Sequence, residues 1–247
     1  MIIPHSRKIH EFALYTAKAS EYRAGELTLK DPDMVHRIVT VLRVARGEGI
    51  ILFNKEFHAR FVCTQMSKKE VTGVLAAKEP NQRALPVVDV LLPLLKRESL
   101  EEAIYGITEC GGDSIQLVMT ERVQRKWQGL HDFERLKRIQ IAAAEQSKHY
   151  TFPEIKEPIA LKDALAQLRV PLMCADVEGQ PYLQTDKEHV ALLVGPEADF
   201  TDTERELIKE HNATLFKLTS TVLRAHQAAT VSVAMIKTLG MYSKLLK

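Results

Sequence analysis

The sequence has few cysteines, few aromatic residues and no apolar run long enough to cross a membrane. Its three cysteines, Cys63, Cys110 and Cys174, lie far apart and form no CxxC pair, so neither a disulfide framework nor a zinc site is indicated. We expect them to be buried small apolar side chains in a reducing compartment. The first ten residues lack the apolar core of a signal peptide. These absences predict a cytoplasmic protein that binds no metal and no membrane.

The chain has 247 residues, of which 45% are hydrophobic, so it can bury a sizeable core and is not expected to be disordered. No GxGxxG motif follows a predicted strand, so a nucleotide-binding oxidoreductase fits poorly. Charge is distributed unevenly. Residues 1–80 carry 13 Lys and Arg against 9 Asp and Glu, whereas residues 81–247 carry 21 against 23. The basic first third favours a module that faces a polyanion, although ordinary solvated surfaces often differ by as much.

Residues 1–80 read as short strands around one helix, which predicts a small β-barrel. Such barrels often bind nucleic acid, although fold analogy is a weak argument. The helix begins at Asp31-Pro32, an N-cap residue followed by proline. Its core stripe is Val35, Ile38 and Leu42, and His36, Thr40 and Arg43 share another face with Arg37 and Arg46 nearby. The predicted strands are 26–29, 49–54, 57–66 and 70–77.

A polar segment with two prolines, residues 79–86, reads as a linker. We place the domain boundary between residues 80 and 81. From Val87 onward strands and helices alternate, which predicts an α/β domain with a parallel sheet. Ser99 with Glu102 has the spacing of a capping box at a helix start, and Gly111-Gly112 ends that helix. The predicted strands are 87–95, 114–119, 170–175, 190–194 and 214–218, and further helices are 132–148, 161–168, one from Thr201, and 222–246.

Residues 190–235 organise the chain. The apolar run Val190–Val194 predicts a strand buried on both faces. It ends in the turn 195–200, where open α/β sheets place ligands, and Thr201 with Glu204 then forms a capping box. A second turn, 219–221, precedes the last helix, so two turns at the same end of adjacent strands could enclose one small molecule. The alternative is an ordinary turn without a ligand. The last helix is apolar on most faces, so it packs in the core or against a second copy.

Several segments in order resemble the motifs of the RsmE-type SPOUT methyltransferases, which transfer a methyl group from S-adenosylmethionine to N3 of one uridine in 16S ribosomal RNA. The resemblance implies an N-terminal PUA-like β-barrel, a C-terminal SPOUT α/β domain with a deep trefoil knot, and a homodimer. The segments that carry it are His36-Arg37 with Val41–Val44 and Gly47, Glu145–Ser147 with Pro153–Ile155, Val194–Glu197 with Phe200-Thr201 and Glu204, and Leu218 with Val222–Ala225.

The resemblance also implies roles for individual residues. Arg224 and His226 are the candidate catalytic residues. Candidates for cofactor binding are Leu172, Leu193, Gly195, Pro196, Glu197, Leu218, Val222 and Leu223. Candidates for RNA binding are Arg7, His36, Arg37, Arg43, Arg46, Gln146 and Lys148. For the basic residues the alternative is a solvated face.

Departures from the family's pattern fall in the functional loops. The family usually has two glycines after Gly-Pro-Glu, and in this sequence those positions are Ala198 and Asp199. At position 199 the chain therefore lacks a glycine, the residue that most easily adopts a positive φ. The Asp199 carboxylate could alter the preference for the cationic cofactor over its neutral product. These departures support a rival hypothesis, a non-catalytic RNA-binding or ribosome-assembly protein with decayed loops. The remaining departures are Thr219, Thr221, His226-Gln227, Lys148-His149, and a missing lysine near Tyr105-Gly106.

Methylation of N3 needs no metal, but the N3 proton must be accepted or the developing anion stabilised. Arg224 is suited to hold uracil oxygens with its planar fork, and the alternative is helix capping or pairing with Asp199. His226 could be a general base or a buried hydrogen-bonded histidine. Glu197 could order its own turn or meet the ligand. We expect Gly195 to hold a conformation or a close approach that a β-carbon would obstruct.

Overall fold

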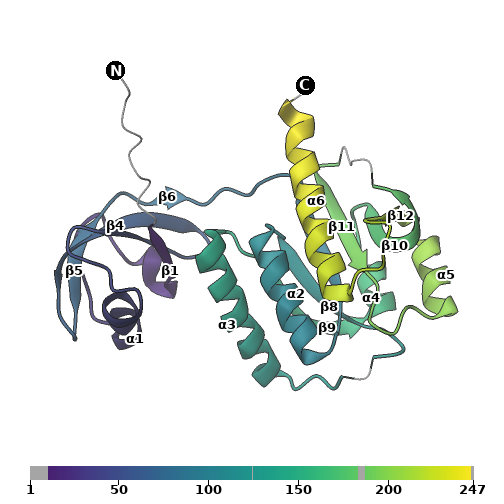
Figure 1. Ribbon diagram of the computed structural model, residues 1–247, viewed down its shortest axis with the longest axis horizontal. Helices are drawn as coiled ribbons and strands as arrows, with labels where there is room; N and C mark the ends of the chain where they lie inside the picture. Colours follow the sequence, from purple (N-terminus) through teal and green to yellow (C-terminus); the bar gives the residue numbers. More distant parts are fainter. Residues whose placement is uncertain (1–10, 124, 183–186, 246–247) are drawn as a thin grey trace. The chain divides into compact units, whose positions relative to one another are not determined.

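The computed structural model describes residues 11–123, 125–182 and 187–245 (Figure 1). Arg7 of the predicted RNA-binding set lies outside them. The chain separates into two compact units, Met1–Asn81 and Gln82–Lys247. Within the described residues, helices with the length and hydrophobicity of a membrane span are absent.

Unit 1 is built on a mostly antiparallel sheet with the strand order β1-β3-β4-β5-β2. The sequence predicted β2 to β5 but missed β1, which pairs in parallel with β3. It also missed β6, which lies at the start of the predicted linker and pairs with β4. Among the described strands β1 and β2 remain the edges of the order, so the sheet is not a closed barrel. The bounds are β1 Phe12–Tyr15, β2 Gly25–Leu29, β3 Gly49–Phe53, β4 Phe57–Met66, β5 Val71–Leu75 and β6 Glu79–Pro80.

The helix of unit 1 changes its geometry half-way along. It begins as α1, Pro32–His36, and the Asp31 side chain accepts a hydrogen bond from the Met34 amide at 2.9 Å, as predicted. It continues as a π-helical turn, η2, over Arg37–Val41, and Arg43 then adopts a φ of 52°. A π-helical turn holds more residues than an α-helical one. His36, Thr40 and Arg43 are all exposed, and the face that they were predicted to share stays a prediction.

Unit 2 is built on a six-stranded sheet with the order β12-β10-β11-β7-β8-β9, in which every pairing is parallel. This confirms the predicted parallel α/β arrangement, although β9 was not predicted. Strand β10 lies between β11 and β12, so the expectation that the two turns follow adjacent strands is wrong. The bounds are β7 Val87–Pro93, β8 Ser114–Met119, β9 Glu154–Ala160, β10 Leu172–Pro181, β11 His189–Val194 and β12 Thr214–Lys217.

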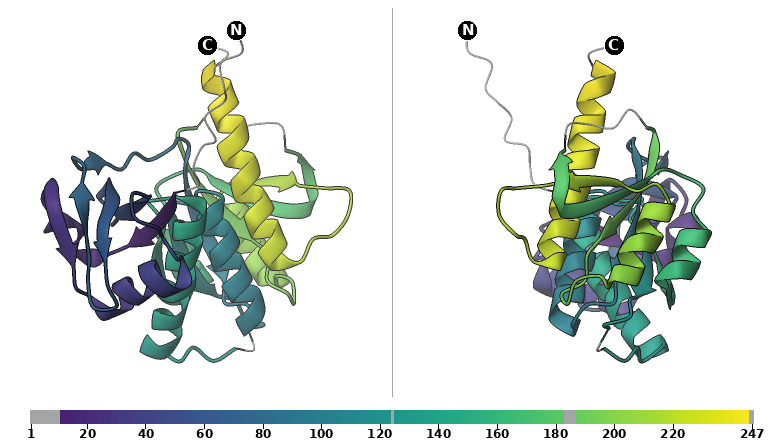
Figure 2. Two further views of the ribbon diagram at one scale, coloured as in Figure 1. Left: turned by 60° about the vertical axis from the view of Figure 1, so that its left-hand side comes forward. Right: turned by 90° about the vertical axis from the view of Figure 1, so that its right-hand side faces the viewer.

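Helices cover both faces of this sheet (Figure 2). On one face Val190, Leu192 and Val194 of β11 pack in a core with α2, α3 and α6. On the other face Ala191 and Leu193 pack in a core with α4 and α5. Alternate side chains of one strand thus enter two cores, which confirms that β11 is buried on both faces. The helices are α2 Arg97–Glu109, α3 Leu130–Ser147, α4 Leu161–Ala166, α5 Asp202–Glu210 and α6 Ala225–Leu245.

Two predicted capping boxes have different outcomes. The box at Thr201 and Glu204 is confirmed, because each side chain accepts a hydrogen bond from the other residue's amide, at 3.2 and 2.9 Å. The box at Ser99 and Glu102 is wrong. Helix α2 begins two residues earlier, with Lys96 as its N-cap, and Ser99 lies inside its first turn.

A buried ion pair joins the beginning of unit 2 to its last helix. The Lys237 ammonium on α6 donates to Asp113 Oδ2 at 2.6 Å and to the Ala84 carbonyl at 2.9 Å. The two charged side chains are 8% and 2% exposed. Burial lowers the pKa of Lys237, and the hydrogen bond to Asp113 opposes that shift.

Two of the cysteines are buried as expected. Cys63 and Cys174 are buried and Cys110 is half-buried, and all three are free thiols. Burial raises the pKa of Cys174 to about 12, so this thiol behaves as a small apolar side chain.

Candidate active site

A cavity of about 620 Å³ lies at the ends of β11 and β12, beside residues 175–177 in the middle of β10. Its walls are this part of β10, the turn after β11, the start of α2 and the loop between β12 and α6. This is the edge of an open α/β sheet where ligands bind, and the volume suits a small molecule. Six of the eight cofactor-binding candidates line it: Gly195, Pro196, Glu197, Leu218, Val222 and Leu223. The side chains of Leu172 and Leu193 are instead buried in the core on the α4 and α5 face.

The turn after β11 is held by contacts from outside it. Glu197 Oε2 accepts a hydrogen bond from the Lys96 amide at 3.2 Å. Glu197 therefore ties the turn to the N-terminus of α2, where a carboxylate is favoured, rather than ordering its own backbone. Arg122 donates to the Ala198 carbonyl at 3.0 Å.

Asp199 replaces a family glycine while keeping the backbone conformation that glycine would allow. Its φ is 60°, and its Oδ1 accepts a hydrogen bond from the Phe200 amide at 2.8 Å. Both carboxylate oxygens accept from Arg205, at 2.8 and 2.7 Å, and Arg205 also donates to Asp176 at 3.0 Å. Hydrogen bonding to Asp199 raises the pKa of Arg205 despite partial burial. The alternative in which Arg224 pairs with Asp199 is wrong, and Arg205 offsets the charge that was expected to act on the cofactor.

The expected special conformation of Gly195 is wrong, whereas a close approach of a ligand stays a prediction. This glycine has no positive φ, and a β-carbon there would lie 3.7 Å from Phe200 Cε2, an ordinary van der Waals contact. Within the protein a small side chain would therefore fit. Because Gly195 lines the cavity, an added side chain would project toward the space that a ligand would use.

The loop before α6 brings Arg224 to the same cavity. Thr219 and Thr221 form a local polar turn, in which the Thr219 hydroxyl donates to the Thr221 carbonyl at 2.6 Å. The Arg224 carbonyl accepts from the Ala228 amide at 2.8 Å, so its backbone starts α6. Its side chain is exposed, and in the described part of the chain its guanidinium has no hydrogen bond or ion pair. The guanidinium group of Arg224 is therefore available to a ligand.

His226 lines the cavity from the first turn of α6, and it has a carboxylate partner. Its Nε2 lies 3.0 Å from Glu102 Oε2 on α2, and the two side chains are 13% and 61% exposed. The missing family lysine has a packing explanation on the same two helices. A β-carbon at Gly106 would lie 2.2 Å from Thr230 Oγ1, so α6 occupies the space that a longer side chain would need.

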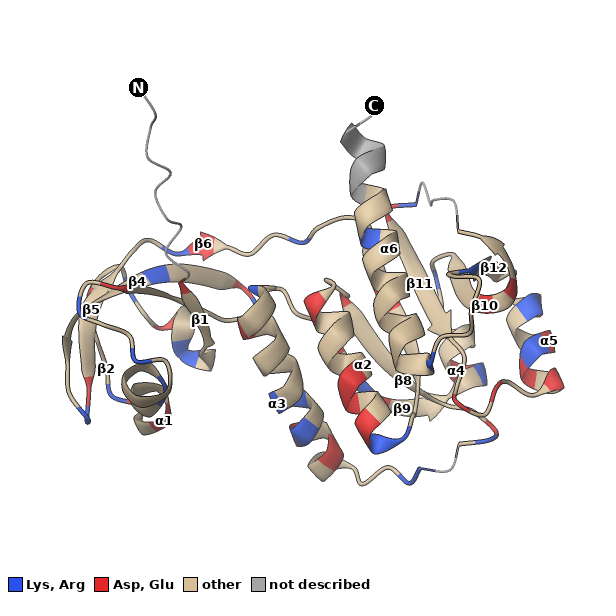
Figure 3. Cartoon of the chain, viewed as in Figure 1, with Lys and Arg blue, Asp and Glu red and all other residues tan. Residues whose placement is uncertain are grey.

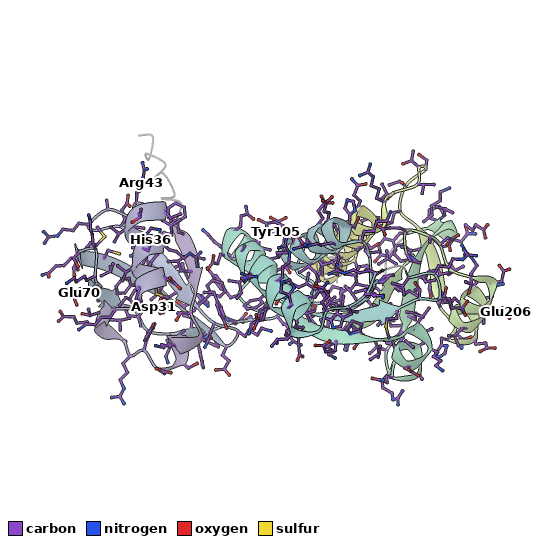
Figure 4. The ribbon with its side chains drawn as sticks, turned by 90° about the horizontal axis from the view of Figure 1, so that it is seen from below. Asp31, His36, Arg43, Glu70, Tyr105 and Glu206 are labelled. Carbon is purple, nitrogen blue, oxygen red and sulfur yellow. The ribbon has the colours of Figure 1, made fainter. Side chains whose placement is uncertain are left out.

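The RNA-binding candidates fall in two places. In unit 1, His36, Arg43 and Arg46 are exposed and Arg37 is half-buried, and Figure 4 labels two of them along the helical segment that begins at Asp31. In unit 2, Gln146 and Lys148 are exposed at the end of α3.

The end of α3 lies far from the cavity within one chain. His149 Nδ1 lies 2.9 Å from the Thr108 carbonyl at the end of α2, whereas the cavity touches the start of α2. The 13 residues of α2 span about 20 Å. Gln146 and Lys148 therefore remain predictions as RNA contacts.

Trp127 acts as an anchor rather than as a free stacking platform. It is half-buried against the core, and its indole N–H donates to Glu157 at 2.6 Å.

The sequence missed several charged residues that line the cavity. Asp176 directly follows the predicted strand 170–175, so the rule that ligands bind at strand ends could have found it. Arg205 and Lys217 carried no local signal. Groups of three or more His, Cys, Asp or Glu side chains suited to a metal ion do not occur among the described residues.

The sequence of the chain is similar to those of known proteins. A family model described as an RNA methyltransferase domain matches residues 81–237. The chain is 27% identical over 227 residues to ribosomal RNA small subunit methyltransferase E of Rickettsia conorii, covering 87% of this chain and 91% of that protein. It is 28% identical over 216 residues to the protein of the same name from Synechocystis sp., covering 83% of this chain and 71% of that protein.

Solved structures share the fold. A methyltransferase from Legionella pneumophila, determined with bound S-adenosylmethionine, aligns with a TM-score of 0.79 and 25% identity, covering 93% of this chain and 98% of that one. Ribosomal RNA small subunit methyltransferase E from Neisseria gonorrhoeae, also bound to S-adenosylmethionine, aligns with a TM-score of 0.80 and 22% identity over the same shares. Because the matched family model spans more than half of the sequence, the chain belongs to the family of RNA methyltransferase domains, as the RsmE-type resemblance of its motifs predicted.

Proposed function

We propose that this chain uses S-adenosylmethionine to methylate N3 of one uridine in the 16S RNA of the small ribosomal subunit. The observation that carries the proposal is the cavity at the ends of β11 and β12, which Arg224 lines without a protein partner among the described residues. The names of the relatives and the S-adenosylmethionine bound in two related structures support it. A non-catalytic protein with decayed loops is less favoured, because the turn 195–200 is held in shape despite its substitutions.

The residues around the cavity fit the cofactor. Phe200, Val222 and Leu223 offer apolar surface for the adenine ring and the methionine chain, while Glu197 and Asp176 offer acceptors for polar groups. The backbone at Gly195 leaves room beside them. When bound there, S-adenosylmethionine supplies an electrophilic methyl group. The protein's own task is to align the acceptor nitrogen with it and to exclude water.

Arg224 would hold the uracil. Loss of the N3 proton places negative charge on the two flanking carbonyl oxygens, and a planar guanidinium can donate to such oxygens in a fixed geometry. This interaction strengthens as charge develops, so it favours the transition state over the ground state.

The proposal extends to the whole protein. Unit 1 would be a PUA-like domain, its sheet open between β1 and β2 among the described strands, that binds RNA phosphates through Arg43, Arg46 and their neighbours. Unit 2 would contain the SPOUT trefoil knot, and the protein would work as a cytoplasmic homodimer. The half-buried Val231, Ala234 and Met235 on α6 supply an apolar face for a second copy. A monomer mass by light scattering at micromolar concentration would contradict the dimer.

The enzyme is tested by calorimetry with S-adenosylmethionine and S-adenosylhomocysteine, and by mass spectrometry of 16S RNA after incubation with the protein. We expect cofactor binding and one methyluridine at N3. Gly195→Val should abolish cofactor binding without unfolding the protein, because its side chain projects into the cavity. Arg224→Gln should bind cofactor but methylate at least about tenfold more slowly. If the wild type binds no cofactor, the non-catalytic alternative replaces this proposal.

The RNA surface is tested by charge reversal at two exposed positions. Arg43→Glu with Arg46→Glu should weaken RNA binding and flatten its dependence on salt, because fewer counterions are released. We prefer Arg46 to the half-buried Arg37, whose reversal would also disturb packing. The matched control is Lys162→Glu with Lys209→Glu, an equal charge change on exposed helix positions of unit 2. Equal loss of affinity in both double variants would show that net charge, and not this surface, governs binding.

A further inference from the structure

Two departures from the family's pattern meet in space beside the cavity. His226 stands where the family usually has glutamate, and α2 lacks the expected lysine near Gly106. In the structure His226 Nε2 lies 3.0 Å from Glu102 Oε2, one turn before Gly106 on the same helix. Figure 3 shows that α2 carries a group of acidic residues. The substitutions therefore leave a carboxylate and an imidazole joined at the wall of the cavity.

The pair fixes how the imidazole can act. A carboxylate accepts hydrogen bonds only, so a hydrogen bond across this 3.0 Å distance would place a proton on Nε2. In the neutral ring Nδ1 is then the acceptor. Among the described residues nothing donates to or accepts from Nδ1, while His226 itself lines the cavity.

We propose that Glu102 positions His226 as the proton acceptor for the methylated base, an inference that rests on the proposed function. Glu102 is a positioning residue, because it acts through the imidazole and does not line the cavity. Arg224 and His226 lie two residues apart at the start of α6 and divide the work. Arg224 holds the uracil oxygens, and His226 takes the proton.

The step balances without a further reactant. The N3–H bond breaks and its proton forms a bond to Nδ1 of His226, giving an imidazolium whose charge the Glu102 carboxylate stabilises. The electron pair left on N3 forms the bond to the methyl carbon, and the pair of the broken sulfur–carbon bond stays on sulfur. The proton leaves Nδ1 for water once the product has departed.

A purely structural ion pair is the competing explanation. Glu102 is 61% exposed, and an exposed pair of this kind contributes little to stability. Removing the carboxylate should therefore leave the fold intact, so a change in catalysis can be measured on a folded protein.

The first experiment uses the protein without cofactor. Nitrogen-15 spectra of the histidine rings should show the Nε2–H proton of His226 downfield and slow to exchange in the wild type, and lost to solvent exchange in Glu102→Ala. The matched control is Glu98→Ala, which removes an exposed carboxylate one turn earlier on α2. If the His226 signal is unchanged in Glu102→Ala, the pair does not exist in solution and the proposal fails.

The second experiment separates chemistry from binding. Affinity for S-adenosylmethionine and for RNA, and KM for both, should stay near wild type in Glu102→Gln and His226→Ala. By contrast kcat should fall about tenfold in the first and about a hundredfold or more in the second. Added imidazole should restore part of the rate of His226→Ala but none of that of Arg224→Gln.

Unchanged kcat in both variants of an active enzyme would overturn the dyad and leave the proposed function standing. A wild type that neither binds cofactor nor methylates would remove the proposed function itself. A rise in KM with kcat unchanged would show that the pair serves substrate binding, which also refutes a proton-accepting role.

Discussion

Replacement of Asp199 by Gly, Asn and Ala separates the backbone strain at this position from the side-chain contacts that hold the turn 195–200. A residue with a β-carbon loses about 1–2 kcal/mol in the left-handed conformation, and Asp and Asn tolerate it best. Asp199 has a φ of 60°, a hydrogen bond from the Phe200 amide and an ion pair in which Arg205 Nη2 donates to both carboxylate oxygens. Its side chain is 63% exposed, so the ion pair adds only about 0–1 kcal/mol, and the hydrogen bond adds a similar amount.

The three variants should therefore differ in order. Asp199→Gly relieves about as much strain as it loses in contacts, so its free energy of unfolding should stay within about 0.5 kcal/mol of wild type. Asp199→Asn keeps the hydrogen bond to Phe200 and should lose about 0.5 kcal/mol, while Asp199→Ala keeps the strain without either contact and should lose about 1–2 kcal/mol. Urea unfolding measures these differences, and calorimetry with S-adenosylhomocysteine should show binding kept or improved in the Gly variant. The reasoning would be refuted by an Ala variant that is as stable as the wild type, or by a Gly variant that is less stable than the Ala variant.

Two further predictions concern stability. Lys237→Met removes the cation that lies 2.6 Å from the buried Asp113 carboxylate and leaves only Arg83, whose Nε is 3.7 Å away and whose side chain is 61% exposed. The free energy of unfolding should fall by up to about 3–5 kcal/mol, and adding Asp113→Asn should recover most of that loss. Equal losses in the single and double variants by urea unfolding would contradict this prediction. For Glu101, hydrogen bonding to Arg135 lowers the pKa of the carboxyl, with Arg97 adding to the effect and burial opposing it. A carboxyl with a depressed pKa in the folded state contributes stability above its unfolded value of about 4.5, and this is lost as pH falls through the folded pKa. Glu101→Gln should therefore be less stable than wild type at pH 7 and should approach it below about pH 4; a difference that is constant with pH would argue against the linkage.

The sequence pattern predicted those elements of unit 2 that neighbouring residues along the chain determine. Val190–Val194 has no polar residue and could only be a strand buried on both faces, and Thr201 with Glu204 carries its own helix start. Strand order is a different matter, because the position of β10 between β11 and β12 depends on pairing across the whole unit. Ser99 had the right spacing for a cap, but the helix found its start at Lys96, where Glu197 accepts a hydrogen bond from the amide.

The site residues also divide into those with a local sequence signal and those that only the fold brings together. Gly195, Glu197 and Arg224 were found through motifs that occupy single turns, and all of them line the cavity. Asp176 and Arg205 reach it from different elements, and their meeting with Asp199 is a property of the folded unit. The π-helical turn at Arg37–Val41 has no signature in the residue pattern, so the sequence predicted a regular α-helix there.

The contact of Lys237 with Ala84 sets the order in which unit 2 can be completed during synthesis. Strand β7 leaves the ribosome early, yet it pairs with β11, about a hundred residues later, and α6 covers its face last. Pro86, just before β7, would also collide with any side chain at position 240, which shows how closely the two ends of the unit meet. A nascent chain must therefore carry uncovered apolar strands until α6 has been made, so the core of unit 2 closes later than that of a domain built from local contacts.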